Sequence, residues 1–162
     1  MKAFDPARFE LGKPLLLGGL RRRHDFAAAE TGIAEQWREF AARDPLPGRI
    51  GASCYGVLCG SDSTGFEYMC AVEVASLAAL KEGIGRMRVP AQRYAVFGYD
   101  ARSTLRSTWQ HVFDWLSTSD YESAHTPDFE LYAPHVDPLD ARAGIELWVG
   151  VVAKPSSGRA IT

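Results

Sequence analysis

The chain repeats one pattern of apolar residues, and this repeat restricts its fold more than any other feature. Two stretches place apolar residues at positions i, i+4 and i+7, the spacing that lines one face of a helix. They contain Ile33, Trp37 and Phe40 in the first stretch, and Leu105, Trp109 and Val112 in the second. The tryptophans stand 109 − 37 = 72 residues apart, an offset typical of a duplicated unit. Both stretches therefore predict amphipathic helices with a tryptophan in the core.

Each predicted helix lies between strands in the same order. One short apolar run precedes the helix, and two runs separated by turn residues follow it. The runs are 15–18, 54–58 and 66–72 in the first half, and 94–98, 128–132 and 145–151 in the second. Each half, about 9–75 and about 90–153, is therefore predicted to be a βαββ unit. The link, about 75–89, has no clear pattern, and 154–162 is a polar tail.

A βαββ unit covers only one face of its small sheet with its helix, so the other face needs a partner. Two such units placed side by side form one continuous antiparallel sheet. The predicted fold is a single α+β domain over 1–162, built of two pseudo-symmetric halves. Both helices are expected on one face of the sheet and a ligand groove on the other.

Bulk properties narrow the function. The formal net charge is −2, whereas nucleic-acid-binding proteins usually carry a basic face. Fewer than about fifteen residues flank the repeated core on either side, which is too few for a helix-turn-helix module. We therefore expect a free-standing protein without direct nucleic-acid contact. The basic run 21–24 is expected to be a solvated loop.

The sequence shows no membrane segment and no metal motif. No apolar run approaches the ~18 residues that cross a bilayer, and the N-terminus lacks the apolar segment of a signal peptide. Three cysteines, at 54, 59 and 70, are expected to be reduced core residues, which favours the cytoplasm. Because no metal-ligand spacing and no Gly-rich phosphate loop is present, we expect neither a metal nor a cofactor.

Alternation along the predicted strands sorts side chains onto two faces. The apolar odd-numbered positions of 145–151 are predicted to lie beneath the helices, together with Tyr68, Phe129 and Leu131. The opposite, groove face is predicted to receive Glu67, Met69, Asp128, Glu130, Tyr132, Glu146 and Trp148. Carboxylates and aromatic rings are thus predicted to converge on one hollow.

The chemistry of these side chains favours one kind of ligand. An aromatic face attracts a cation by ~0.5–2 kcal/mol, and a carboxylate pairs with a positive centre most strongly where water is excluded. The predicted ligand is a planar, apolar or cationic compound, bound with micromolar affinity. Burial between rings is also expected to raise the pKa of a carboxyl group, which leaves general acid or base chemistry open.

Five segments, in their order and spacing, resemble one known family: 89–97, 105–109, 115–116, 127–132 and 145–149. They are similar to the GyrI-like small-molecule-binding domain, also called the AraC-type effector-binding domain. The resemblance implies a duplicated βαββ fold with a central pocket, and it puts the family's ligand-contacting glutamate at Glu130. Aromatic pocket positions correspond to Tyr132, Trp115 and Trp148, and the first half is expected to add Tyr55 and Glu67.

Members of this family differ in function, so three interpretations stay open. The first is a protein that binds, sequesters or senses small molecules. The second is a hydrolase that opens the cyclopropane of DNA-alkylating natural products, with Glu130 and Tyr132 as catalytic residues and Glu146 as a second candidate. The third is a modulator of a protein partner, such as a gyrase inhibitor. The protein is expected to be a monomer or a homodimer, and a plain surface role for Glu130, paired with an arginine, is the alternative to a site.

Overall fold

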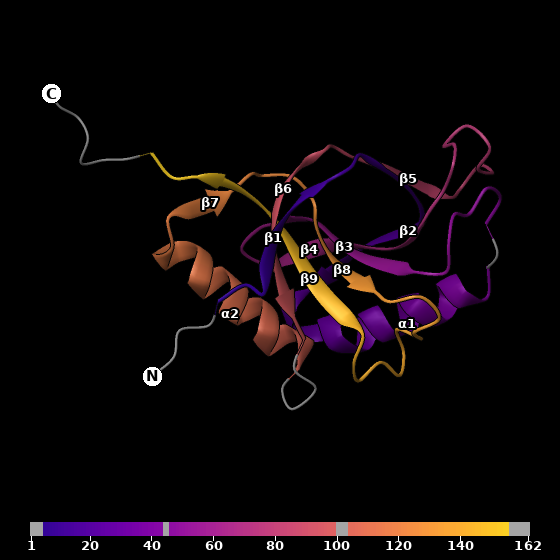
Figure 1. The fold of residues 1–162 in the computed structure, drawn as a ribbon. Coiled ribbons are helices and arrows are strands. Elements are labelled where there is room, and N and C mark those ends of the chain that lie inside the picture. Colours follow the sequence, from indigo (N-terminus) through magenta and orange to yellow (C-terminus); the bar gives the residue numbers. More distant parts are fainter. Residues whose placement is uncertain (1–4, 44–45, 100–103, 156–162) are drawn as a thin grey trace, which may run out of the picture.

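The computed structural model describes residues 5–43, 46–99 and 104–155. Its strands and helices follow one another in this order: β1 (Arg8–Gly12), β2 (Leu15–Asp25), the 3-10 turn η1 (Phe26–Ala28), α1 (Ala29–Ala41), β3 (Cys54–Ser61), β4 (Gly65–Glu73), β5 (Gly85–Val89), β6 (Gln92–Gly98), α2 (Leu105–Thr118), β7 (Tyr121–Ser123), β8 (Asp128–Tyr132) and β9 (Ile145–Ala153). Figure 1 shows both helices along one side of a curved sheet. The predicted α+β class, with two helices and an antiparallel sheet, is confirmed.

The strand order shows the duplication directly. In the first half, β4 pairs with β2 and β3, and in the second half β9 pairs with β6 and β8. The halves meet where β3 pairs with β8, and all of these pairings are antiparallel. Each half therefore has the predicted βαββ order, with the short β7 added after α2 in the second half, and their shared sheet places the start of β3 opposite the end of β8.

A long two-stranded ribbon, which the sequence did not reveal, also joins the halves. β1 pairs with β6, and β2 pairs with β5. In both pairings the residue numbers of the two partners add up to 104, from Arg8 with Val96 to Gly19 with Gly85. The register is therefore continuous across the gap, where Pro14 and Pro90 stand. Proline lacks the N–H that a ladder needs, so the ribbon interrupts its bonding there. β5 comes from the link 75–89 that had no assigned structure.

The curved sheet buries apolar side chains on both faces. On the helix face, Trp37 and Phe40 of α1 and Trp109 and Val112 of α2 belong to one buried cluster. The opposite face carries a second cluster, drawn from six strands: Leu15, Leu17, Tyr55, Val57, Met69, Ala71, Met87, Val89, Tyr94, Val96 and Phe129. The face where a groove was predicted is therefore filled by side chains, because the ribbon links the two ends of the sheet and side chains of β2, β5 and β6 pack against those of β3, β4 and β8.

The basic run 21–24 is not a loop, contrary to expectation. It forms the second part of β2, and three of its side chains make ion pairs: Arg21 with Glu67 at 2.9 Å, Arg22 with Glu39 at 3.0 Å, and Arg23 with Asp62 at 2.7 Å. Neighbouring carboxylates compensate the repulsion between adjacent arginines, so the run stays extended. Among the described residues no helix is long and apolar enough to cross a membrane.

Candidate functional site

Glu130 is a buried carboxylate on the helix face of the sheet. Its side chain is 4% exposed, and the residue lies opposite Gly56 of β3 and Leu147 of β9. Residues directly opposite each other in an antiparallel pair share a face. Because Leu147 belongs to the cluster beneath the helices, Glu130 points toward α1 and α2 as well.

Three neutral donors hold the Glu130 carboxylate. Its Oε1 accepts hydrogen bonds from the hydroxyls of Tyr68, at 2.7 Å, and Tyr132, at 2.9 Å. Its Oε2 accepts from the indole N–H of Trp109 at 3.0 Å. The indole N–H of Trp37 donates to the Tyr68 hydroxyl at 3.2 Å, so both helices contribute a tryptophan to one network.

None of the three hydrogen bonds to the Glu130 carboxylate comes from a cationic side chain. Burial raises the pKa of this carboxyl group above its ordinary value, and the three hydrogen bonds act in the opposite direction. Burial and the neighbouring carboxylate also raise the pKa values of Tyr68 and Tyr132, so both hydroxyls stay protonated donors at neutral pH. A buried carboxylate gains strongly from a cation that arrives without its water, because the low dielectric enlarges the attraction.

Gly56 makes room for this network. A Cβ at this position would lie 2.0 Å from the Tyr68 hydroxyl and 2.4 Å from Oε1 of Glu130. Such distances cannot exist between non-bonded atoms, so any side chain at position 56 displaces the two groups. The absence of a side chain in the middle of β3 therefore permits the hydrogen bond between Tyr68 and Glu130.

We expect Gly56→Ala to destabilise the fold by about 1–3 kcal/mol, the usual cost of overpacking a core, and to disrupt the Glu130 network. Gly60→Ala, on the same strand, is the matched control, because a Cβ there meets nothing within 4 Å. Urea titration of both variants gives the two free energies of unfolding. Equal stability of the two would contradict the close packing at Gly56.

The predicted convergence of all the acidic and aromatic residues on one hollow is wrong. Glu130 and Tyr132 share a face with Leu147 and Ile145, whereas Phe129 lies opposite Trp148 on the other face. Alternation within each strand was read correctly. The prediction of which β8 residues share a face with which β9 residues was wrong, because this depends on the register in which the two strands pair.

The remaining predicted residues lie in three separate environments. Tyr55 and Met69 are buried in the second cluster, and Trp148 packs against it. Glu67 forms its ion pair with Arg21. Trp115 lies on the helix face, where its ring stacks on Tyr121, at 6.0 Å between centroids, and meets Phe97 edge-on, at 5.3 Å. These residues are therefore not brought together around Glu130.

Glu146 and Trp148 already hold a cation supplied by the chain. Arg8 of β1 donates two hydrogen bonds to the Glu146 carboxylate, at 2.8 and 3.0 Å, and its guanidinium lies 5.7 Å from the Trp148 ring centroid. The Trp148 indole also donates to Glu146 at 3.1 Å. The bond from Arg8 lowers the pKa of Glu146, so this carboxylate is ionised and paired with a cation of the chain, which Glu10 shares.

A second carboxyl group with a raised pKa lies at the start of β8. Asp128 accepts one hydrogen bond, at 2.9 Å, from the backbone N–H of Gly150. Burial raises its pKa to about 7. Nearby, the Gln92 amide nitrogen and the Tyr94 hydroxyl are also buried. No group of three or more His, Cys, Asp or Glu in the described part of the chain could hold a metal ion.

Sequence reasoning missed three members of the Glu130 network. Trp37 and Trp109 were assigned to the core from the helical stripe, and Tyr68 from strand alternation. All three are indeed buried. A buried tryptophan N–H or tyrosine O–H needs a polar partner, and that requirement is the signal that points from these residues to the nearest carboxylate.

The fold is that of a class of effector-binding domains. The chain matches the family described as integron-associated effector binding protein, Cass2, over residues 14–151, and it belongs to that family. This agrees with the GyrI-like resemblance of the sequence.

Individual relatives extend the comparison. The transcriptional regulator BrlR of Pseudomonas aeruginosa is 27% identical over 124 residues, which cover 74% of this chain and 46% of BrlR. The chain thus spans less than half the length of that curated relative. The structure of SAV2435 bound to tetraphenylphosphonium has a TM-score of 0.68 at 18% identity and covers 90% of this chain and 93% of its own. An integron cassette protein from the mobile metagenome of Vibrio cholerae has a TM-score of 0.66 at 20% identity, with 93% and 98% covered. At these identities, the two structures establish the common fold.

Proposed function

We propose that this protein binds apolar organic cations, planar ones included, between α1 and α2, with the Glu130 carboxylate as the counter-charge. One observation carries the proposal: a buried carboxylate is held by three neutral donors, and no cation takes part in those bonds. Keeping such a group ionised inside a protein is costly. A bound cation reduces that cost, and the surrounding rings of Trp37, Trp109 and Tyr132 provide cation–π contacts.

The comparisons support the chemistry of this ligand. The family is described by effector binding, and a protein of the same fold is described as bound to tetraphenylphosphonium, an aromatic cation. We propose that the biological role is to bind, sequester or sense compounds of this class, as the effector-binding part of a regulatory system or on its own.

Isothermal titration with tetraphenylphosphonium and tetraphenylborate tests the role of charge. The two ions have nearly the same shape and opposite charge. We expect micromolar binding of the cation, and binding of the anion that is at least about tenfold weaker, since the carboxylate attracts the cation and repels the anion. Equal affinity for the two ions would contradict a site built on a carboxylate.

A hydrolase is the second candidate, because Glu130 combines a raised pKa with two tyrosine hydroxyls on the same oxygen. A carboxyl group of this kind suits general acid–base chemistry. Incubation with a cyclopropyl-indole electrophile, followed by mass spectrometry, tests this reaction. Hydrolysis adds one water to the substrate and depends on Glu130. Binding without the water adduct leaves a binding protein.

A further inference from the structure

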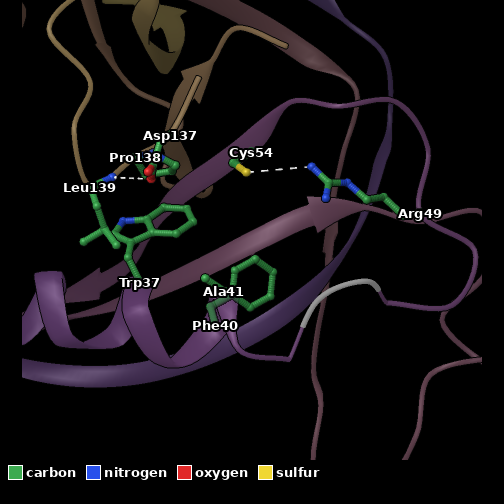
Figure 2. A pocket seen from close by; sticks show the side chains of 8 residues that line it. All are labelled: Trp37, Phe40, Ala41, Arg49, Cys54, Asp137, Pro138 and Leu139. Atoms are coloured by element: carbon green, nitrogen blue, oxygen red, sulfur yellow. Dashed lines mark hydrogen bonds between the residues drawn. The ribbon is translucent and has the colours of Figure 1, made fainter. Parts of the chain in front are cut away.

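A small recess lies beside the Glu130 network, at the C-terminal end of α1. It has a volume of about 120 Å³ and is lined by Trp37, Phe40, Ala41, Arg49, Cys54, Asp137, Pro138 and Leu139. Figure 2 shows α1 contributing one wall, and the loop that carries Leu139 facing it. Leu139 is 41% exposed, whereas Trp37 is 4% exposed, so the recess extends from the surface to a buried indole.

The indole of Trp37 stands between this recess and the tyrosines that hold Glu130. Its ring centroid lies 5.6 Å from that of Tyr132 and 6.4 Å from that of Tyr68, in edge contacts. Cys54, on another side of the recess, is paired directly with Tyr132 across β3 and β8. One aromatic side chain therefore separates the recess from both hydroxyls on Oε1 of Glu130.

The two pseudo-equivalent tryptophans differ in how firmly they are held. Trp109 donates to the carboxylate itself, at 3.0 Å, whereas Trp37 donates to a neutral hydroxyl at 3.2 Å. Hydrogen bonds to a charged acceptor are about twice as strong as neutral ones. Trp37 is also the one of the two that borders the recess. Moving the Trp37 indole therefore breaks the weaker of the two bonds, and the recess gives the ring space to move into.

We propose that this recess is the outer subsite of the ligand site, where an aromatic cation is held before the Trp37 indole moves aside and admits the cation to Glu130. Of the two charged residues in the lining, Arg49 and the exposed Asp137, Asp137 supplies the carboxylate that attracts the arriving cation, and Leu139 supplies an apolar contact. The inference rests on the proposed function and adds the route by which the ligand reaches the carboxylate.

Stopped-flow fluorescence with ethidium as the planar cation tests the route. Leu139→Trp narrows the mouth from the solvent side and is expected to slow association about five- to tenfold, equivalent to a barrier of about 1–1.4 kcal/mol. Leu11→Trp is the matched control, because Leu11 is 81% exposed on β1 and does not line the recess. Its association rate should equal that of the wild type.

Trp37→Phe is the second variant, since it keeps an aromatic wall and removes the bond to Tyr68. Association should become about fivefold faster, because one neutral hydrogen bond no longer opposes opening. Wild-type rates in both Leu139→Trp and Trp37→Phe, with ethidium bound normally at equilibrium, would overturn the route and leave the Glu130 site intact. Failure of the wild type to bind either ethidium or tetraphenylphosphonium would overturn the proposed function, and the outer subsite with it.

Discussion

Glu130→Gln is expected to weaken the binding of tetraphenylphosphonium by about 1.5–3 kcal/mol, or roughly ten- to a hundredfold, because the cation loses a desolvated counter-charge. The fold should persist. The glutamine amide can accept from Trp109 through its oxygen and donate to the hydroxyl oxygens of Tyr68 and Tyr132, which reorient. Isothermal titration gives the affinity, and circular dichroism confirms the fold.

Glu146→Gln is the matched control for this loss. Glu146 is also a strand glutamate bonded to an indole N–H, but it is already paired with a cation, Arg8. We expect its removal to leave the affinity for the cation unchanged. An unaltered dissociation constant in Glu130→Gln, or a loss confined to Glu146→Gln, would contradict the placement of the site on the helix face.

Asp128→Asn is expected to stabilise the protein at and above pH 7. Burial raises the pKa of Asp128 from 3.8 to about 7 in the folded state, so folded protein binds more protons than unfolded protein between these values. Stability therefore falls as the pH rises from about 4 to about 7, and it stays low above that range. The loss reaches at most about 4 kcal/mol, an upper limit because the residue keeps some contact with water.

Urea unfolding between pH 4 and pH 8 measures this dependence. The wild type should lose stability across the range, and Asp128→Asn should show a flatter profile that crosses above it. Glu146→Gln is expected to change the stability in the opposite direction. The pKa of Glu146 is lowered in the folded state by Arg8, so its charge stabilises the protein at neutral pH and its removal destabilises it. Parallel profiles of the wild type and Asp128→Asn would rule out the buried, raised-pKa state of Asp128.

The repeat in the sequence was sufficient to predict the fold class and most of the strands. Helical stripes around Trp37 and Trp109 mark α1 and α2, since a 3.6-residue period is local information. The ribbon could not be predicted, because its strands depend on pairing between segments that are far apart in the sequence. β5 has the sequence Gly-Arg-Met-Arg-Val and β1 has Arg-Phe-Glu-Leu-Gly. Such short, charged segments become strands only because a distant partner pairs with them.

In the candidate site, too, the local sequence predicts some features, and the pairing of distant strands determines the others. Glu130 could be identified from the Phe-Glu-x-Tyr pattern, in which Tyr132 follows on the same face. The face itself could not, because a shift of one residue in register moves a whole strand's side chains to the other side. The register that pairs Glu130 with Leu147 joins segments whose connection is a loop of irregular sequence, and nothing local encodes it.

The crystal structure of the complex with tetraphenylphosphonium tests most directly where the cation binds. We expect the phosphorus centre between α1 and α2, with phenyl rings against Trp37 and Tyr132 and the Glu130 carboxylate as the nearest charged group. The contrary result is electron density for the cation beside Glu146 and Trp148, with Arg8 displaced. If Glu130 then keeps its bonds to Tyr68, Tyr132 and Trp109, the placement of the site at Glu130 is contradicted.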